Sequence, residues 1–310
     1  MKYRITHRTE YHYRDAVPLC HNVVHIRPRD TTKQTCIEYE LNVDPAPLFE
    51  RDGLDFFGNH VAWFSLQEPH RGLTIEAKSE VEVNAVPPDA ACGAQPWEQA
   101  VATLREASDP LLRQARQYTF ASPHIPLAEP LADFARTSFT PGRPLLEAAT
   151  DLTGRIFREF KYKSGVTTIG TSVLDILTSR QGVCQDFAHL MIGGLRSLGL
   201  AARYVSGYLV TAPVAGQPRM IGADQSHAWV SLYCPGSGWI DFDPTNNVLP
   251  SDQHVTLGWA RDYDDIAPVK GVIIGGRRHT MKVSVDVAPL VPSPGTPGEG
   301  STPLPANVLG

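Results

Sequence analysis

The first 86 residues alternate between short β-rich runs and clusters of turn-forming residues. The runs are rich in Val, Ile, Tyr and Thr, and the residues between them are Asp, Pro, Gly and Asn, at a spacing typical of packed antiparallel strands. The runs comprise residues 3–6, 11–13, 23–28, 36–43, 61–66 and 73–83. This pattern predicts a small N-terminal β-sandwich over residues 1–86.

The pattern changes at residue 87, where prolines begin to interrupt short helical segments. Residues 87–143 are therefore predicted to form a helical, proline-rich connector. Beyond it, apolar residues recur every three to four positions, which indicates an amphipathic helix with Pro144 near its first turn. The apolar positions of this helix are Leu145, Ala149, Leu152, Ile156 and Phe160.

The following residues predict a helix and then a set of strands. A short helix is expected at about 172–179, and a longer one opens at Gly182 and stops at Gly199, where a glycine suits the C′ position. Strands are expected at 202–210, 227–233, 238–243 and 281–287. This order predicts an α+β domain over residues 144–290, so the fold class is α+β with an N-terminal antiparallel β-sandwich. Residues 291–310 are too rich in Pro and Gly to pack and are predicted to be a disordered tail.

Composition narrows the class of protein. With 42% hydrophobic and 20% charged residues, the chain is neither wholly disordered nor a coiled coil. Its formal net charge of −5 argues against a general partner role for nucleic acid or an anionic membrane. No apolar run reaches the roughly 18 residues of a membrane helix, and no apolar segment follows the charged N-terminus, so we expect a cytoplasmic protein.

The chain has five cysteines at wide spacings and no C-x-x-C pair. This arrangement does not predict a zinc site or a redox dithiol, and a metal site at His21 and His25 is not expected because they lie in a predicted strand. We therefore expect reduced thiols and no cofactor. The remaining question is whether one thiol is a nucleophile.

Cys184 lies where a nucleophilic thiol would be placed. Catalytic cysteines act as thiolates, and a helix N-terminus or a cationic neighbour lowers a thiol pKa from its usual value of roughly 8.5. Gly182 permits a tight entry into the helix, and the backbone N–H groups of the first helical turn can hold an oxyanion. Cys184 is thus the candidate nucleophile.

His227 and Asp243 are the candidate partners of Cys184. His227 opens one predicted strand and Asp243 ends the next, so a hairpin through residues 234–238 would make them neighbours. In such a relay, His227 accepts the thiol proton and returns it to the leaving group, while Asp243 orients the imidazole.

Three sequence blocks carry a family resemblance. The segments 182–188 (GVCQDFA), 226–230 (SHAWV) and 238–246 (GWIDFDPTN) resemble, in that order, the catalytic blocks of the transglutaminase-like superfamily. Residues 55–59 (DFFGN), 160–162 (FKY) and 258–271 are similar to segments of its bacterial branch, which is commonly described as cysteine proteases. The resemblance covers about residues 1–290, and it implies a papain-like core with Cys184, His227 and Asp243 as the catalytic triad.

The resemblance leaves the acyl acceptor open. Water would make the protein a protease or amidase acting on a peptide or protein substrate, whereas an amine would make it a transglutaminase. The animal crosslinking enzymes carry calcium sites and further β-barrels, and this chain has no loop of the EF-hand type, so hydrolysis is favoured. A third hypothesis is a non-catalytic binding module with a relict triad. The sequence does not determine the oligomeric state, and substrate specificity is expected to lie in loops such as 211–224.

Several polar residues near these blocks have alternative interpretations. Asp241 would share a strand face with Asp243 and is its rival as the orienting acid, although the Asp-Pro-Thr context favours Asp243. His189 is expected to be a buried core histidine, and Asp186 a first-turn helix charge. Tyr162 is either an oxyanion donor or a core residue.

Overall fold

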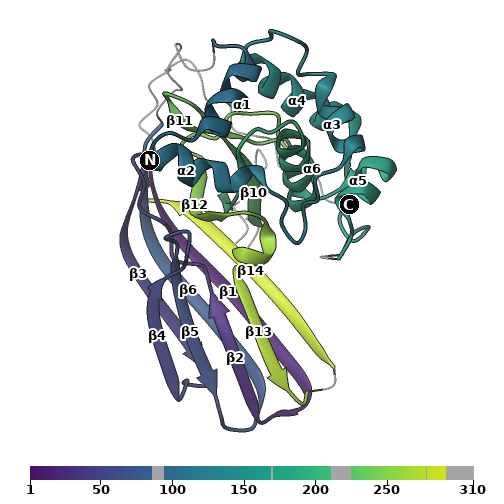
Figure 1. Cartoon of the computed structure of the whole chain (residues 1–310). Coiled ribbons are helices and arrows are strands. Elements are labelled where there is room, and N and C mark those ends of the chain that lie inside the picture. Colours follow the sequence, from purple (N-terminus) through teal and green to yellow (C-terminus); the bar gives the residue numbers. More distant parts are fainter. Residues whose placement is uncertain (86–93, 169, 211–224, 277, 291–310) are drawn as a thin grey trace, which may run out of the picture.

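We describe residues 1–85, 94–168, 170–210, 225–276 and 278–290 of a computed structural model of the chain. The beginning of the predicted connector, the predicted specificity loop 211–224 and the predicted tail 291–310 lie outside these ranges. Within them, the chain forms a β-sandwich and an α+β domain, so the predicted fold class is confirmed (Figure 1).

The β-sandwich consists of two four-stranded antiparallel sheets with the strand orders β14-β1-β6-β3 and β13-β2-β5-β4. Alternate residues of each strand are buried between the sheets, as the period of a β-strand requires. On β6, for example, Leu73, Ile75 and Ala77 face the core of the sandwich. Its strands are β1 (Lys2–Val17), β2 (Leu19–Val24), β3 (Gln34–Asp44), β4 (Phe49–Leu54), β5 (His60–Leu66), β6 (His70–Val83), β13 (Val269–Ile274) and β14 (His279–Pro289).

Two strands of the sandwich come from the far end of the described chain. β14 pairs along β1 from Tyr3 opposite Pro289 to Tyr13 opposite His279, and β13 pairs along β2. The sequence pattern predicts an α+β domain that extends to residue 290, and for these two strands that prediction is wrong. Alternation of polar and apolar residues identifies a strand but not its partner, so the sequence pattern could not assign this segment to the distant sheet.

The α+β domain has a layer of helices on one face of a four-stranded antiparallel sheet with the order β11-β10-β9-β12 (Figure 1). Helices α1 and α3 of the predicted connector pack with α4 and α6 in the same apolar core, so this segment is part of the domain. The helices are α1 (Trp97–Glu106), α2 (Pro110–Arg116), α3 (Glu129–Arg136), α4 (Leu145–Glu159), α5 (Val173–Ser179) and α6 (Cys184–Ser197), with 3₁₀ turns η1 (Gln117–Thr119) and η2 (Tyr263–Asp265). The strands are β7 (Lys161–Tyr162), β8 (Gln181–Gly182), β9 (Ala202–Leu209), β10 (Gln225–Cys234), β11 (Gly238–Phe242) and β12 (His254–Ala260).

Helix α6 is the central element of this domain. Nearly all of its side chains are buried, among them Phe187, Leu190 and Leu195, because other helices cover one side of α6 and the sheet covers the other. Gly199 follows it with a φ of +88°, which confirms the predicted C′ glycine. Among the described residues, no helix is long and apolar enough to cross a membrane.

The sandwich holds the outer edge of β12 through two amide side chains. Gln34 donates to the carbonyl of Thr256 and accepts from its N–H, both at 2.8 Å. Asn59 makes the same pair of bonds to Trp259, at 2.9 and 3.0 Å. Because β12 is an edge strand, these amides take the place of a neighbouring strand. The segment that resembles the bacterial branch, around Asn59, thus fixes the position of β12.

Candidate active site

Cys184 is the first residue of α6 and is partly exposed. The chain enters the helix through β8, which pairs in parallel with β7 so that Tyr162 lies opposite Gly182. The Asp186 carboxylate accepts hydrogen bonds of 2.8 Å from the Val183 N–H and from the Thr167 hydroxyl. A Cβ atom on Gly182 would lie 2.8 Å from that carboxylate, so only glycine allows this tight turn. Asp186 therefore acts as a cap that fixes the turn before the thiol, in agreement with its predicted structural role.

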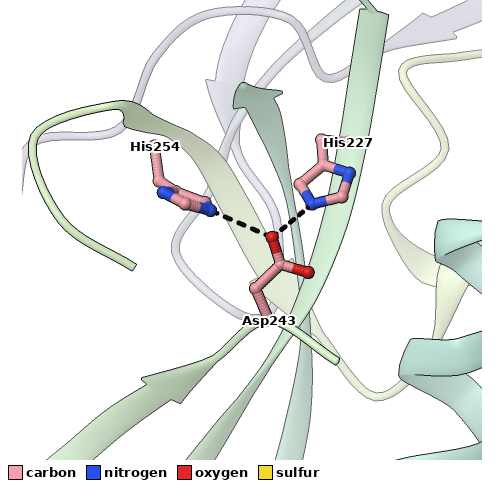
Figure 2. Close-up of side chains that lie close together, drawn as sticks. All are labelled: His227, Asp243 and His254. Carbon is pink, nitrogen blue, oxygen red and sulfur yellow. Dashed lines mark hydrogen bonds and ion pairs between the residues drawn. The ribbon is translucent and has the colours of Figure 1, made fainter. Parts of the chain in front are cut away.

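His227 lies near the start of β10, and Asp243 directly follows β11. His227 Nε2 donates a hydrogen bond of 2.8 Å to Asp243 Oδ2, and both side chains are buried (Figure 2). The two strands form the expected hairpin, with Val230 paired to Phe242. The predicted contact between His227 and Asp243 is therefore present.

The Asp243 carboxylate accepts five hydrogen bonds. Oδ1 accepts from the backbone N–H groups of Thr245 and Asn246, at 2.9 and 3.2 Å. Oδ2 accepts from His227, from the Asn246 side chain at 2.7 Å and from His254 Nε2 at 3.1 Å (Figure 2). Burial alone would raise the pKa of Asp243. The charges and hydrogen bonds of His227 and His254 outweigh this effect and hold the pKa well below its usual range. Asp243 is thus a buried and fully paired carboxylate.

The thiol of Cys184 is the other partner of His227. Burial lowers the pKa of His227, whereas the Asp243 carboxylate and a hydrogen bond with the Cys184 side chain raise it, with a net value of about 10. Since Nε2 faces Asp243, Nδ1 is the ring nitrogen left for the thiol. The structure thus brings the three residues predicted from the sequence together, with His227 bonded to Asp243 and close to Cys184. Their catalytic role stays a prediction.

Two residues of this network were not singled out from the sequence. Asn246 belongs to the third quoted block, so the turn that follows Asp243 was the available signal. His254 opens β12, and its neighbours in the sequence give no indication that it meets Asp243. A carboxylate only accepts hydrogen bonds, so both His227 and His254 carry a proton on Nε2.

Three of these residues are also close enough to hold a metal ion. The ligand atoms of His227, Asp243 and His254 lie within 4.8 Å of one another. A cation such as Zn²⁺ takes nitrogen and oxygen ligands of this type, but it needs unprotonated ring nitrogens. Here both ring N–H groups and the Asn246 amide already occupy Asp243 Oδ2, so a metal would have to displace three hydrogen bonds. The described contacts favour a hydrogen-bond network.

The other polar residues considered in the sequence lie outside the contact between His227 and Asp243. Asp241 lines a separate cavity on the sheet and is not a partner of His227 in the described contacts. His189 accepts a hydrogen bond from the Tyr263 N–H at 3.2 Å, and burial lowers its pKa to about 3, as suits a neutral core histidine. Tyr162 packs edge-on against Phe187, and burial, together with the nearby Cys184, raises its pKa to about 12.

Two family models match the chain at these domains. Residues 3–82 match the bacterial transglutaminase-like N-terminal region, and residues 132–244 match the transglutaminase-like superfamily. The second match contains Cys184, His227 and Asp243. An uncharacterized protein of Mycobacterium tuberculosis is 42% identical over 296 residues, which cover 93% of each chain.

The chain belongs to the transglutaminase-like superfamily.

The chain is also similar to a named enzyme and to a protein of known structure. A protein-glutamine gamma-glutamyltransferase of Pseudomonas aeruginosa is 33% identical over 178 residues, which cover 55% of this chain and 26% of that one. The crystal structure of a proposed cysteine protease from Cytophaga hutchinsonii superposes with a TM-score of 0.71 at 21% identity, covering 98% of this chain and 93% of the other. That structural likeness shows that the two chains share a fold over nearly their whole length.

Proposed function

We propose that this chain is a cysteine hydrolase that cleaves a peptide or isopeptide-type amide through an acyl-thioester on Cys184. The proposal rests on one arrangement of side chains. His227 lies between the Cys184 thiol at the start of α6 and the Asp243 carboxylate, which accepts five hydrogen bonds. Membership of the superfamily supports thiol-based acyl transfer in general.

The first half of the reaction forms the acyl-enzyme. His227 holds a proton near neutral pH because the Asp243 carboxylate lies beside it, and the thiol then stands as the thiolate of an ion pair. The thiolate attacks the carbonyl carbon, and a C–S bond forms while the oxygen becomes an oxyanion. Backbone N–H groups at the start of α6 have no carbonyl partner within the helix and can hold this oxyanion. His227 then gives its proton to the amide nitrogen, the C–N bond breaks, and the amine leaves.

The second half releases the acyl group. His227 is now neutral and takes a proton from water, whose oxygen attacks the thioester carbon. The C–S bond breaks, the carboxylic acid leaves, and the thiolate and protonated His227 are restored. Asp243 stays ionised throughout, because five hydrogen-bond donors stabilise its carboxylate, and the carboxylate in turn stabilises the charged imidazole of His227.

Transfer to an amine is the second candidate, and the similarity to the Pseudomonas aeruginosa protein-glutamine gamma-glutamyltransferase favours it. Both reactions share the acyl-enzyme and differ only in the nucleophile of the second half. Water needs no binding site of its own, whereas an amine must be bound beside the thioester, so we propose water as the acceptor.

One experiment separates the two candidates. The chain is incubated with a glutamine-containing peptide library and a labelled primary amine in ¹⁸O-water, with Cys184→Ala as the control. Hydrolysis puts ¹⁸O into a new carboxylate, and transfer puts the amine label into an amide. Products that form equally with Cys184→Ala would contradict both candidates, and amine adducts without ¹⁸O products would replace the first with the second.

A further inference from the structure

A cavity of about 1050 Å³ lies on the face of the β11-β10-β9-β12 sheet away from α6. On β10, Ala228 and Val230 pack in the core with α6, whereas Trp229 points the opposite way and lines the cavity. The β-sandwich and the segment α2–η1 supply the other walls, including Arg29, Phe57 and Tyr118. Cys184 is not among the lining residues, so this cavity is separate from the thiol.

Arg203, on β9, lies between two tryptophan rings in this cavity. Its guanidinium carbon is 4.1 Å from the centroid of the Trp239 ring and 3.7 Å from that of the Trp259 ring. The guanidinium of Arg29 covers the other face of Trp259, at 3.8 Å. Because both faces of the Arg203 guanidinium are stacked, only its edge is left for a hydrogen-bonding partner.

The Arg203 side chain has a polar atom without a partner. The residue is 8% exposed, and in the described part of the chain its buried Nε makes no hydrogen bond. Burial lowers the pKa of Arg203 to about 9, although the charge of Asp241 raises it. A guanidinium removed from water without hydrogen-bond acceptors is costly, so this arrangement is incomplete without a further acceptor.

Two other residues of the cavity wall also have a buried nitrogen atom without a described partner. Trp229 Nε1 and His254 Nδ1 are buried and, among the described residues, have no hydrogen-bond partner. The charged groups of the lining are Arg29, Lys33 and Arg203 against Asp241, which leaves an excess of positive charge. The uncharged part of the wall is mixed, and its aromatic residues are Phe56, Phe57, Tyr118, Trp229, Trp239 and Trp259.

We propose that this cavity is a binding site for a small organic carboxylate with an apolar body. The planar carboxylate matches the free edge of the Arg203 guanidinium, to which it can accept two parallel hydrogen bonds. The apolar body would lie against the aromatic wall, and the cavity is as large as the sites that bury drug-sized ligands.

The proposal does not depend on the thiol chemistry. Binding can therefore be measured on the full chain with Cys184→Ala, so a failure of the proposed hydrolase activity and a failure of this site are distinguishable. Three of the five tryptophans of the chain line the cavity, so tryptophan fluorescence reports on its occupancy.

The test compares two pairs of probes by calorimetry and tryptophan fluorescence. The first pair is cyclohexylacetate and its carboxamide, and the second is N-acetyl-leucyl-leucine and its C-terminal amide. The carboxylates are expected to bind about tenfold more tightly than their amides. The pair with the larger difference shows whether a free organic acid or a peptide C-terminus is the better ligand.

Two variants test the residues. Arg203→Met is expected to remove the preference for carboxylate, whereas Asp241→Asn should tighten carboxylate binding about threefold because it removes the acidic group of the lining. If Arg203→Met does not fold, Asp241→Asn and the two probe pairs still show whether the cavity prefers carboxylates. Equal binding of acid and amide, no binding of either carboxylate at about 10 mM, or an unchanged preference in folded Arg203→Met would overturn the proposal.

Discussion

Asp243, just after β11, and Arg203, on β9, are two buried charged residues of the α+β domain, and their surroundings differ. Asp243 accepts five hydrogen bonds from backbone and side chains. Arg203 is stacked between two indole rings, and its Nε has no hydrogen-bond partner in the described part of the chain. Both groups lose hydration on burial, but among the described residues the carboxylate gains five hydrogen bonds in return, whereas Arg203 Nε gains none.

Asp243 therefore has its hydrogen-bond partners within the protein, whereas Arg203 has an open position for a partner from outside. The donors around Asp243 fix the position of the carboxylate and so of the His227 ring, which is what a relay must have before substrate arrives. The environment of Arg203 holds the guanidinium in place by stacking and leaves its edge open, which suits a group that binds an external partner.

The largest effect is expected for Asp243→Asn. An amide in this position turns N–H groups toward groups that already donate, so about 3 kcal/mol of the free energy of unfolding should be lost. Urea unfolding followed by circular dichroism measures it. Asp241→Asn is the matched control, since the same change at a partly exposed position of the same hairpin should cost less than about 0.5 kcal/mol. Equal losses in the two variants would contradict the contrast.

His254→Phe should cost about 2 kcal/mol, since it removes a buried hydrogen bond to Asp243 Oδ2 while it keeps a ring against Trp229. His254 is a positioning residue, so the pH profile of Cys184 alkylation should also move, as His227 loses part of its orientation. A stability loss with an unchanged alkylation profile would limit His254 to a structural role.

The stability of the folded chain should depend on pH through His227. Its pKa in the folded chain is raised to about 10, above the roughly 6.5 of a free histidine, so its contribution is fully present below pH 6.5 and is lost as pH rises toward 10. The groups that face it are Asp243, Cys184, His254 and Asn246. In the Cys184→Ala background, where no thiol shares the proton, the difference in unfolding free energy between chains with His227 and with His227→Gln should shrink by about 1 kcal/mol between pH 6.5 and 7.5. A difference that grows over this range would contradict a protonated His227.

The smallest effect is expected for Arg203→Met. The substitution loses two cation–π contacts but also relieves the cost of burying a guanidinium whose Nε has no described partner, so the free energy of unfolding should change by less than about 1 kcal/mol. Thermal and urea unfolding both measure it. A loss as large as that of Asp243→Asn would mean that Arg203 is as well satisfied as the carboxylate.

The sequence predicted most of the α+β domain because its signals are local. The apolar period of residues 145–160, the glycine after the helix that Cys184 opens, and the hairpin between His227 and Asp243 each depend on neighbouring residues. The three quoted blocks then identified the three residues of the relay, and the structure brings these side chains together.

The features that were missed depend on distant pairings. β14 was predicted as a strand, but its partner β1 lies at the other end of the chain. His254 meets Asp243 only because β12 lies beside β9 in the sheet, and Arg203 lies in the cavity only because the β-sandwich covers that face. No periodicity in a single sequence encodes such contacts.

The pairing of Cys184 with His227 can be measured through the pH dependence of iodoacetamide alkylation at Cys184, read by peptide mass spectrometry. Cys36 is an internal control, because it is also partly exposed and burial raises its pKa. If Cys184 and His227 form an ion pair, Cys184 should be alkylated at pH 6 at least about tenfold faster than Cys36, and His227→Ala should abolish this advantage. Equal rates at the two thiols, or an advantage that survives His227→Ala, would contradict the account.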